Sequence, residues 1–387
     1  MPRPRWRVTK PLRERIAAGH PWVFDRALEP TSGVAAGDVV ALVDDRGPLA
    51  TALADPASPI RARVLDLDPE ARCDGAWARE RAAHASARRT RDPLLAGCTG
   101  RRLVHGEGDA CPGLVIDAYA DTAVVVYDGP AAARFWSARL PDVLAGLEAG
   151  GAAIAHVWVR GDRKDRGIGE AARGAPPAEI AIAEDEARFG VDVRAGQKTG
   201  FFLDQRENRR AVRRHAAGAA VLNVFCYTGG FSLHAALGGA TRVTSVDVAA
   251  PAIAAIARNL ELSALPAAIH ERVAIDAFVY FEQAIARGDR WDLVIVDPPS
   301  FAPSEKARPA ALKSYARLID AALAVTRTGG RLALASCSSH VTEADLLALC
   351  ARPDLRLRAS AGAASDHPVL PAFGEGRYLK FLLFDLD

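Results

Sequence analysis

The stretch that most constrains the fold of this chain covers residues 221–232. An apolar, β-branched run leads into the paired glycines Gly229 and Gly230, and an apolar-periodic segment follows them. This pattern predicts a buried strand, a tight turn and the start of a helix. A second strand-like run ends on Asp247, 24 residues after Asn223. In a doubly wound sheet, a carboxylate about 20 residues beyond the first turn can bind ribose hydroxyls.

The same turn limits the ligand that it can bind. It lacks the G-x-G-x-x-G spacing that brings the backbone against a pyrophosphate. A nucleoside ligand without a diphosphate therefore fits better than NAD, and S-adenosylmethionine is the common ligand of this kind. The alternative is a βαβ unit with a structural glycine turn and a solvated aspartate, because short motifs also match by chance.

Three later strand-like runs end in residues that can carry chemistry. They lead to Asp276, to an Asp297-Pro298-Pro299 turn, and to Cys337 between two serines. Open α/β sheets bind ligands beyond the carboxyl ends of their strands, so these side chains are predicted to face one crevice. Asp297 is predicted to act there as an acceptor or a proton donor. The position of Cys337 at a strand end favours a role as a nucleophile, although a lone cysteine is more commonly a small core residue.

Length and composition predict a soluble protein of more than one domain. The chain has 387 residues, of which 50% are hydrophobic and 25% charged. The net charge is only +2, so attraction to nucleic acid would require clustered cations. Six cysteines without C-x-x-C spacing argue against a zinc ribbon or a disulfide framework, and no metal site is predicted. No apolar run is long enough to span a bilayer, and the basic start lacks a signal-peptide core, so a cytoplasmic location is expected.

The N-terminal region is predicted to form a small β-barrel behind a basic arm. Short alternating runs between turn residues follow one another over residues 38–65. The arm interleaves cations with an aromatic ring, which suits RNA because guanidiniums contact phosphates and rings stack on bases. A solvated arm without a ligand is an equally open interpretation. Trp22 and Phe24 are expected in the barrel core.

The middle of the chain is predicted to be a compact α+β domain. A helix over residues 76–90 leads into it, and its strands flank one helix over residues 132–148. Beyond it, a Gly-Gln-Lys-Thr-Gly stretch precedes two phenylalanines and a segment that opens a helix at residues 204–208. Helix capping alone would explain the acidic and amide side chains near the start of this helix. We favour a polar lid with an aromatic hinge that closes over a ligand.

Taken together, these residues resemble a known family essentially from end to end. The chain resembles the RlmI-like family of class I S-adenosylmethionine-dependent ribosomal RNA cytosine methyltransferases. Residues 19–24 resemble the opening of that family's PUA domain, a small RNA-binding barrel, and residues 106–114 resemble its central α+β domain. The family's methyltransferase motifs are matched in order by residues 196–208, 227–232, 297–299 and 336–338. Val248 and Cys111 depart from the family pattern.

The resemblance implies an α/β fold in three domains: a PUA-like barrel over residues 1–72, a linker helix and central α+β domain over 73–190, and a Rossmann-like methyltransferase domain over 191–387. It implies methylation of a cytosine 5-carbon in large-subunit (23S) ribosomal RNA, with S-adenosylmethionine as cofactor, no membrane and a homodimer. Cys337 would add to the 6-carbon of the ring and Asp297 would hold the base edge.

The resemblance also assigns binding residues. Asp247 would bind the ribose and Asp276 the adenine. The cofactor-binding set implied is Phe202, Asp204, Asn223, Tyr227, Thr228, Gly229, Gly230, Asp247, Asp276 and Asp297. The RNA-binding set implied is Arg3, Arg5, Arg7, Lys10, Lys198, Arg206, Pro298, Pro299 and Phe301.

Two other functions remain open from the residues alone. An Asp-Pro-Pro turn also suits a methyltransferase that acts on an exocyclic amine or a small molecule, and such an enzyme would not need Cys337. A non-catalytic RNA-binding or assembly factor could keep the fold and merely bind S-adenosylmethionine. The complete acidic set and the intact lid stretch argue against this second alternative.

Overall fold

The structure is a computed structural model that describes residues 3–30, 33–161 and 168–387. The chain folds into two compact units. Unit 1 comprises the chain up to Ile180 together with Val191–Leu203 and Ser365–Gly376, and unit 2 comprises Ala181–Gly190, Asp204–Ala364 and Arg377–Asp387. The three-domain division stays a prediction, because these units group the chain differently.

Unit 2 is built on a seven-stranded sheet flanked by helices. Its strands are, in spatial order, β15 (His270–Ala274), β14 (Arg242–Asp247), β13 (Ala220–Val224), β16 (Trp291–Val296), β17 (Thr326–Ser336), β19 (Lys380–Leu386) and β18 (Leu355–Ala361). The first five are parallel, and β19 runs antiparallel to both of its neighbours. The helices are α5 (Arg206–Arg214), α6 (Gly230–Leu237), α7 (Ala250–Leu262), α8 (Ala277–Arg287), α9 (Arg308–Val325) and α10 (Glu343–Leu349).

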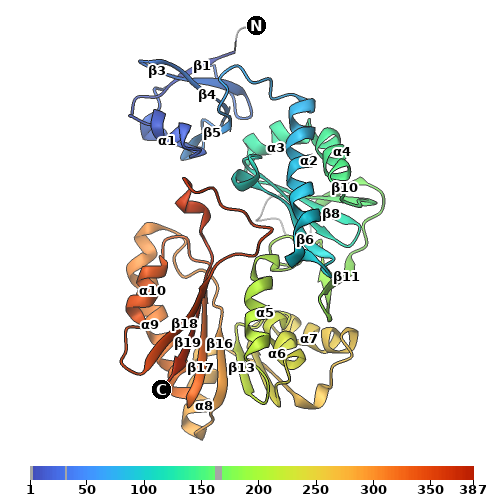
Figure 1. Cartoon of the computed structure of the whole chain (residues 1–387), viewed down its shortest axis with the longest axis vertical. Helices are drawn as coiled ribbons and strands as arrows, with labels where there is room; N and C mark the ends of the chain where they lie inside the picture. The colour runs from blue at the N-terminus through green and yellow to red at the C-terminus, as the bar shows by residue number, and fades with distance from the viewer. Residues whose placement is uncertain (1–2, 31–32, 162–167) are drawn as a thin grey trace. The chain divides into compact units, whose positions relative to one another are not determined.

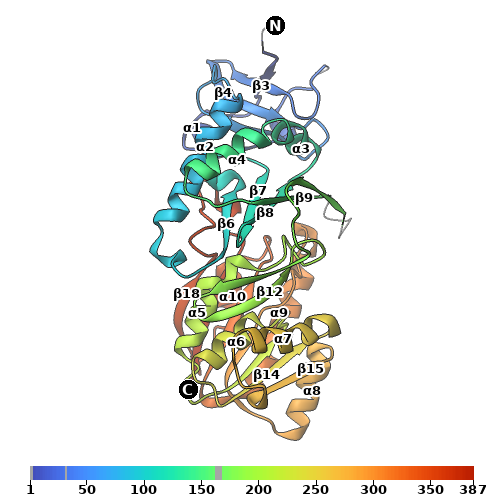
Figure 2. The same ribbon diagram turned by 90° about the vertical axis from the view of Figure 1, so that its right-hand side faces the viewer.

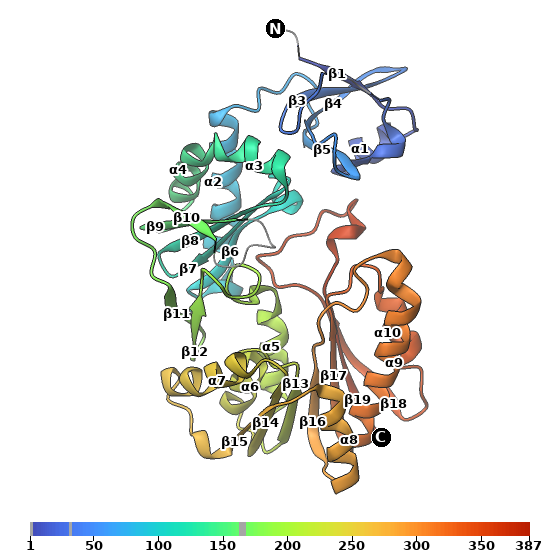
Figure 3. The same cartoon turned by 180° about the vertical axis from the view of Figure 1, so that it is seen from behind.

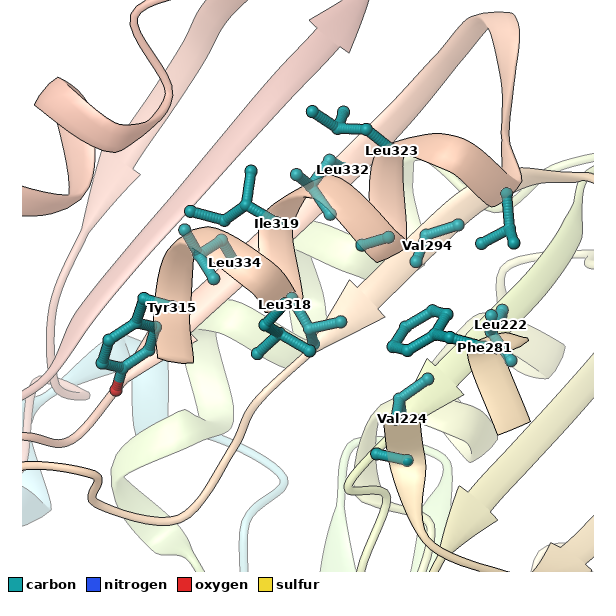
Figure 4. Packing of buried hydrophobic residues seen from close by; sticks show 14 of the residues in the cluster. Leu222, Val224, Phe281, Val294, Tyr315, Leu318, Ile319, Leu323, Leu332 and Leu334 are labelled. Carbon is teal, nitrogen blue, oxygen red and sulfur yellow. The ribbon is translucent and has the colours of Figure 1, made fainter. Parts of the chain in front are cut away.

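Alternate residues of the unit 2 strands face opposite helix layers. Leu222, Val224 and Val294 pack with α8 and α9 in one apolar cluster (Figure 4). Val221 and Leu293 pack with α5 and α6 in another. Figures 1 and 3 show these two layers on opposite sides of the sheet. A strand buried on both faces is mostly apolar, which explains why these runs show no regular alternation of polar and apolar residues in the sequence.

Unit 1 contains two five-stranded sheets. The first has the order β1 (Arg5–Arg7), β3 (Val39–Asp44), β4 (Gly47–Ala54), β5 (Ile60–Asp66) and β2 (Trp22–Phe24), with helix α1 (Arg13–Ala17). The second has the order β10 (Gly169–Arg173), β9 (His156–Arg160), β8 (Thr122–Tyr127), β7 (Leu114–Tyr119) and β6 (Gly100–His105). Figure 2 shows this second sheet beside its helices, which are α2 (Gly75–Arg91), α3 (Pro130–Ser137) and α4 (Leu140–Ala149).

The remaining elements are short. The hairpin of β11 (Glu179–Glu184) and β12 (Ala187–Asp192) has residues in both units. Single 3-10 turns lie at Asp25–Ala27, Pro93–Leu95, Gly106–Asp109, Leu203–Gln205, Ala267–Ile269, Glu305–Ala307 and Gly374–Gly376.

Two local predictions for unit 1 are wrong. The single helix expected over 132–148 is divided into α3 and α4, because Pro141 has no amide hydrogen to continue the first helix and sits in the first turn of the second. Trp22 and Phe24 are not in the barrel core. Val23 between them is fully buried, whereas Phe24 is 40% exposed, since successive side chains of a strand point to opposite faces.

Candidate cofactor and catalytic site

The sheet register of unit 2 brings the predicted cofactor and catalytic loops to one edge. Val224 at the end of β13 pairs with Val246 of β14 on one side and with Val296 of β16 on the other. Asp247 and Asp297, which follow these partners, therefore flank the turn after β13. The strand order reverses between β14 and β16, and ligands of open α/β sheets bind at such a switch point.

The turn after β13 has an unusual backbone. Phe225, Tyr227 and Gly229 have positive φ angles of 61°, 47° and 85°. Such angles are uncommon for residues with a side chain, and they persist only where the surroundings hold them. The Asp247 carboxylate supplies part of that hold, because its two oxygens accept hydrogen bonds of 2.9 Å from the amides of Tyr227 and Ala249.

The polar atoms of this turn fit a nucleoside ligand. Within the described residues, the buried oxygens Oδ1 of Asn223 and Oγ1 of Thr228 accept or donate no hydrogen bond. Buried polar atoms are rarely left without partners, so these two match a polar ligand group. Asp276 is exposed and caps α8 by accepting hydrogen bonds from the amides of Phe278 and Val279. One Asp276 oxygen, Oδ1, is therefore already engaged by the protein.

Two predicted residues are held by side chains that are not among the predicted site residues. Gln205 Nε2 donates a 3.0 Å hydrogen bond to Asp297 Oδ2. The Tyr378 hydroxyl donates a 2.6 Å hydrogen bond to Oδ2 of the buried Asp204. Tyr378 lies 174 positions from its partner. Only the fold brings Gln205 and Tyr378 to their distant partners, which is why the sequence pattern does not predict these contacts.

The loop that carries Cys337 is joined to the Asp-Pro-Pro loop by hydroxyl groups. The buried Tyr315 hydroxyl contacts Ser336 Oγ at 2.7 Å and Ser338 Oγ at 3.1 Å. Ser338 Oγ also accepts hydrogen bonds from Ser300 Oγ and from the amide of Phe301. Burial raises the pKa of Tyr315, so it remains a neutral hydroxyl. Tyr315 is a site residue that its helical, core-like spacing concealed.

The Asp-Pro-Pro loop itself is partly open to solvent. Pro298 is buried, Pro299 is exposed, and Phe301 is half-buried with its ring 5.0 Å from that of Tyr315. Asp297 is half-buried. This loop can therefore present a carboxylate and an apolar surface at the same strand edge as Cys337.

Cys337 differs from the other cysteines in its surroundings. All six cysteines lie in described residues, and Cys337 is the one that is not buried. Burial raises the pKa of Cys73 and Cys350 to about 11, and that of Cys226 well above the ordinary thiol value. A thiolate is the nucleophilic form, so these buried cysteines are poor candidates.

The predicted lid stretch is divided between the units. Lys198 and Phe202 belong to unit 1, where the Lys198 ammonium lies 4.5 Å from the centre of the Phe202 ring. The same stretch is anchored on unit 1 through Thr199, whose hydroxyl contacts Tyr119 at 2.7 Å and donates to Asp117 at 2.5 Å. Asp204 and Arg206 belong to unit 2.

Arg206 does not fit the predicted RNA contact. It is fully buried, and its guanidinium lies 4.0 Å from Glu184 and 3.9 Å from Glu207. Other arginines of α5 also face acids: Arg209 binds Glu184 with two hydrogen bonds. The acidic run over residues 184–186 of the β11–β12 hairpin thus pairs with three arginines of α5, which are Arg209, Arg210 and Arg213.

The basic arm has a mixed environment. The Arg3 guanidinium donates hydrogen bonds of 2.7–2.9 Å to Thr51 Oγ1 and to the carbonyls of Pro69 and Ala71. Arg7 forms ion pairs with Glu29 and Asp45. Arg5 and Lys10 are exposed. Two of the four predicted cations therefore contact protein groups in this structure.

Comparison with known proteins identifies the family. A model of S-adenosylmethionine-dependent methyltransferases matches residues 101–384, and a PUA-like domain model matches residues 7–67. The chain belongs to this methyltransferase family. The "Ribosomal RNA large subunit methyltransferase" of Deinococcus radiodurans is 38% identical over 100% of this chain and 98% of its own length. "Ribosomal RNA large subunit methyltransferase I" of Escherichia coli O127:H6 is 34% identical over 96% of this chain and 97% of its own.

Solved structures agree on the fold of this methyltransferase. A structure described as a SAM-dependent methyltransferase from Streptococcus mutans has a TM-score of 0.85 at 24% identity, covering 99% of this chain and 100% of its own. Another methyltransferase structure, a complex with SAH, has a TM-score of 0.86 at 23% identity over the same shares. The recognised family, the Rossmann-like fold and the S-adenosylmethionine cofactor are thereby confirmed. No described helix is long and apolar enough to cross a membrane.

Proposed function

We propose that this methyltransferase modifies the 5-carbon of a cytosine in large-subunit ribosomal RNA, through a covalent bond to Cys337. The observation that carries the proposal is the partly exposed thiol of Cys337 on a loop tied by Tyr315 and Ser338 to the loop of Asp297. The names of the relatives support the class of RNA.

Bound S-adenosylmethionine would supply an electrophilic methyl group. Asp247 would hold the ribose through the lone pairs that its two amide hydrogen bonds leave free, and Asp276 would meet the adenine. Asn223 and the turn over residues 227–230 would line the rest of the cofactor. Asp204 would lie near the methionine end of the cofactor, and Phe202 is proposed as a further cofactor-binding residue.

The 5-carbon of cytosine is a weak nucleophile, which is why a covalent step is needed. The Cys337 thiolate would add to C6, and the electrons of the C5–C6 bond would then attack the methyl group from C5. Asp297 would hold the N3 and amino edge, where charge changes during attack. Loss of the C5 proton to a base and elimination of the thiolate would restore the ring and the free enzyme.

The RNA must present its base outside a helix to reach these loops. Pro298, Pro299 and Phe301 would contact the extruded nucleotide, while Arg5, Lys10 and Lys198 would contact its backbone. Arg3 and Arg7 are weaker candidates, because their guanidiniums already contact protein groups. We also propose that the protein works in the cytoplasm as a homodimer, which sedimentation of the purified protein would test.

The deciding experiment replaces Cys337 and traps the adduct. Cys337→Ala should abolish methyl transfer to ribosomal RNA while leaving the affinities for S-adenosylmethionine and RNA nearly unchanged, because the thiol acts along the reaction path. RNA with 5-fluorocytosine at the target should trap the unaltered protein as an adduct that survives denaturing gels, since fluorine does not leave as a proton does.

Cys226→Ala is the matched control. Cys226 lies in the turn after β13 but is buried, so this variant should still form the adduct. An active Cys337→Ala enzyme, or an adduct that maps to another cysteine, would contradict the covalent 5-carbon mechanism. Methylation of an exocyclic amine would then become the better proposal.

A further inference from the structure

We propose that the buried ammonium of Lys380 is the counter-charge that stabilises the Cys337 thiolate. This inference rests on the proposed function, because the covalent mechanism requires that thiolate. It adds to the site a residue that lies outside every predicted catalytic or binding set.

The fold places Lys380 directly beside the loop of Cys337. Lys380 begins β19, and its register partner is Ser336, the last residue of β17 and the immediate neighbour of Cys337. Lys380 Nζ donates a 2.6 Å hydrogen bond to the carbonyl of Ser338, which is the neighbour on the other side. The ammonium group is therefore attached to the short loop that presents the thiol.

Lys380 is an unusual residue for this position. It is 6% exposed, and β19 is otherwise an apolar strand over residues 381–384. Among the described residues, its ammonium donates hydrogen bonds to two neutral carbonyl oxygens, those of Ser338 and Tyr378, and to no carboxylate. A buried cation is costly unless a negative charge compensates it, so the site should contain one.

The charged neighbours of Lys380 point to Cys337 as that compensation. Burial lowers the pKa of Lys380 to about 8, and the charges of Cys337 and then Asp345 oppose the decrease. Asp345 is already engaged, because it pairs with Arg308 at 2.6 Å and caps α10 with Thr342.

Two more titratable groups belong to this cluster. Tyr315 contacts the serines on either side of Cys337, and burial keeps it neutral. The charge of Asp297, on the neighbouring loop, further raises the pKa of Tyr315, and Asp297 Oδ2 accepts a hydrogen bond from Gln205. Neither group supplies a positive charge, and Arg308 is already paired with Asp345. Among the described residues, Lys380 is the cation that is hydrogen-bonded to the Cys337 loop.

The chemical consequence is a shift in the proton equilibrium of the thiol. Cys337 would release its proton to solvent and remain as a thiolate beside an ammonium that keeps its own proton. A nearby cation lowers a thiol pKa and increases the nucleophile present near neutral pH. No bond to Lys380 forms or breaks, so its role is electrostatic and positioning.

The test measures the thiol directly and needs neither RNA nor methyl transfer. The rate of Cys337 alkylation by iodoacetamide, followed by mass spectrometry across pH, reports thiolate formation. Lys380→Met should raise the midpoint of this pH profile by about one pH unit or more. At a pH below the midpoints of both proteins, the variant should therefore be alkylated about tenfold more slowly. Lys380→Arg should keep a low midpoint. Lys313→Met, which removes an exposed lysine of α9, should leave the midpoint unchanged.

A reciprocal measurement covers the case in which Lys380→Met does not fold. Coupling between two sites is mutual, so Cys337→Ala should lower the pH midpoint at which Lys380 loses its proton. NMR of protein with lysine labelled at the ε-carbon measures that midpoint. An unchanged Cys337 midpoint in folded Lys380→Met, or an unchanged Lys380 midpoint in Cys337→Ala, would overturn the inference. If the coupling is present but Cys337→Ala still methylates RNA, the proposed function fails and the charge pair stands.

Discussion

The strand-end edge of unit 2 and the basic arm of unit 1 both carry polar residues grouped in the sequence, but the fold uses the two groups differently. At the edge, register and strand order hold Asp247 and Asp297 beside one turn, whatever their sequence separation. In the arm, the Arg3 guanidinium donates hydrogen bonds to protein groups, whereas Arg5 is exposed to solvent. Position at the end of a parallel strand is therefore stronger evidence for a site than charge in an arm.

The largest expected effect is a loss of cofactor affinity when a residue at the strand-end edge is replaced. Asp247→Ala removes the acceptor for the amides of Tyr227 and Ala249 as well as the proposed ribose contact. Each charge-assisted hydrogen bond is worth about 1.5–3 kcal/mol, so S-adenosylmethionine affinity should fall at least tenfold. Calorimetric titration measures this loss.

Asp276→Ala serves as the comparison within the same edge. Asp276 is exposed and caps α8, and loss of a cap costs about 1 kcal/mol of stability. Its effect on cofactor affinity should be smaller than that of Asp247→Ala. Unchanged S-adenosylmethionine affinity in Asp247→Ala would show that this residue does not bind the cofactor. The contrast between the strand-end residues and the basic arm would then no longer hold.

The second effect is in the arm and concerns stability. Arg3→Ala should lower the free energy of unfolding by about 1–3 kcal/mol, because it leaves Thr51 and two carbonyls without their guanidinium donor. Thermal melting measures this change. RNA affinity at a temperature where the variant is folded should stay close to that of the unaltered protein; a large decrease in RNA affinity would show that Arg3 is a ligand after all.

Much of the fold was accessible from the sequence because the unit 2 strands are apolar runs that end in turn signals. The run predicted to lead to Asp297 is β16, and the run predicted to end on Asp247 is β14. Pairings across long separations were not accessible. Glu184, which neutralises part of α5, lies 25 residues before Arg209, and Lys380 meets the Cys337 loop only through strand pairing.

The third effect concerns the exposed cations of the arm. Replacing Arg5 and Lys10 together by alanine should weaken RNA binding and make its salt dependence shallower, by roughly 0.7–0.9 in slope for each phosphate that is no longer neutralised. Fluorescence anisotropy at several salt concentrations measures the slope. Melting temperature should not change, since both side chains are exposed.

Arg7→Ala is the matched control for that pair. Arg7 is held by Glu29 and Asp45, so its replacement should change the salt slope less than replacement of Arg5 and Lys10 does. An equal slope in the double variant and the unaltered protein would mean that the arm is solvated and binds no RNA.

The smallest effect is expected on the outer face of β2. Phe24→Ala should cost at most about 1 kcal/mol of stability, because the ring is 40% exposed and its described ring contact is an edge-on pair with Trp22 at 6.2 Å. Val23→Ala, one residue earlier, should cost about 1.5 kcal/mol or more, because it removes two fully buried methyl groups. Chemical denaturation of both variants measures the difference. If Phe24→Ala were the more damaging of the two, Phe24 would belong to the barrel core, and this face of unit 1 would be unavailable to any ligand.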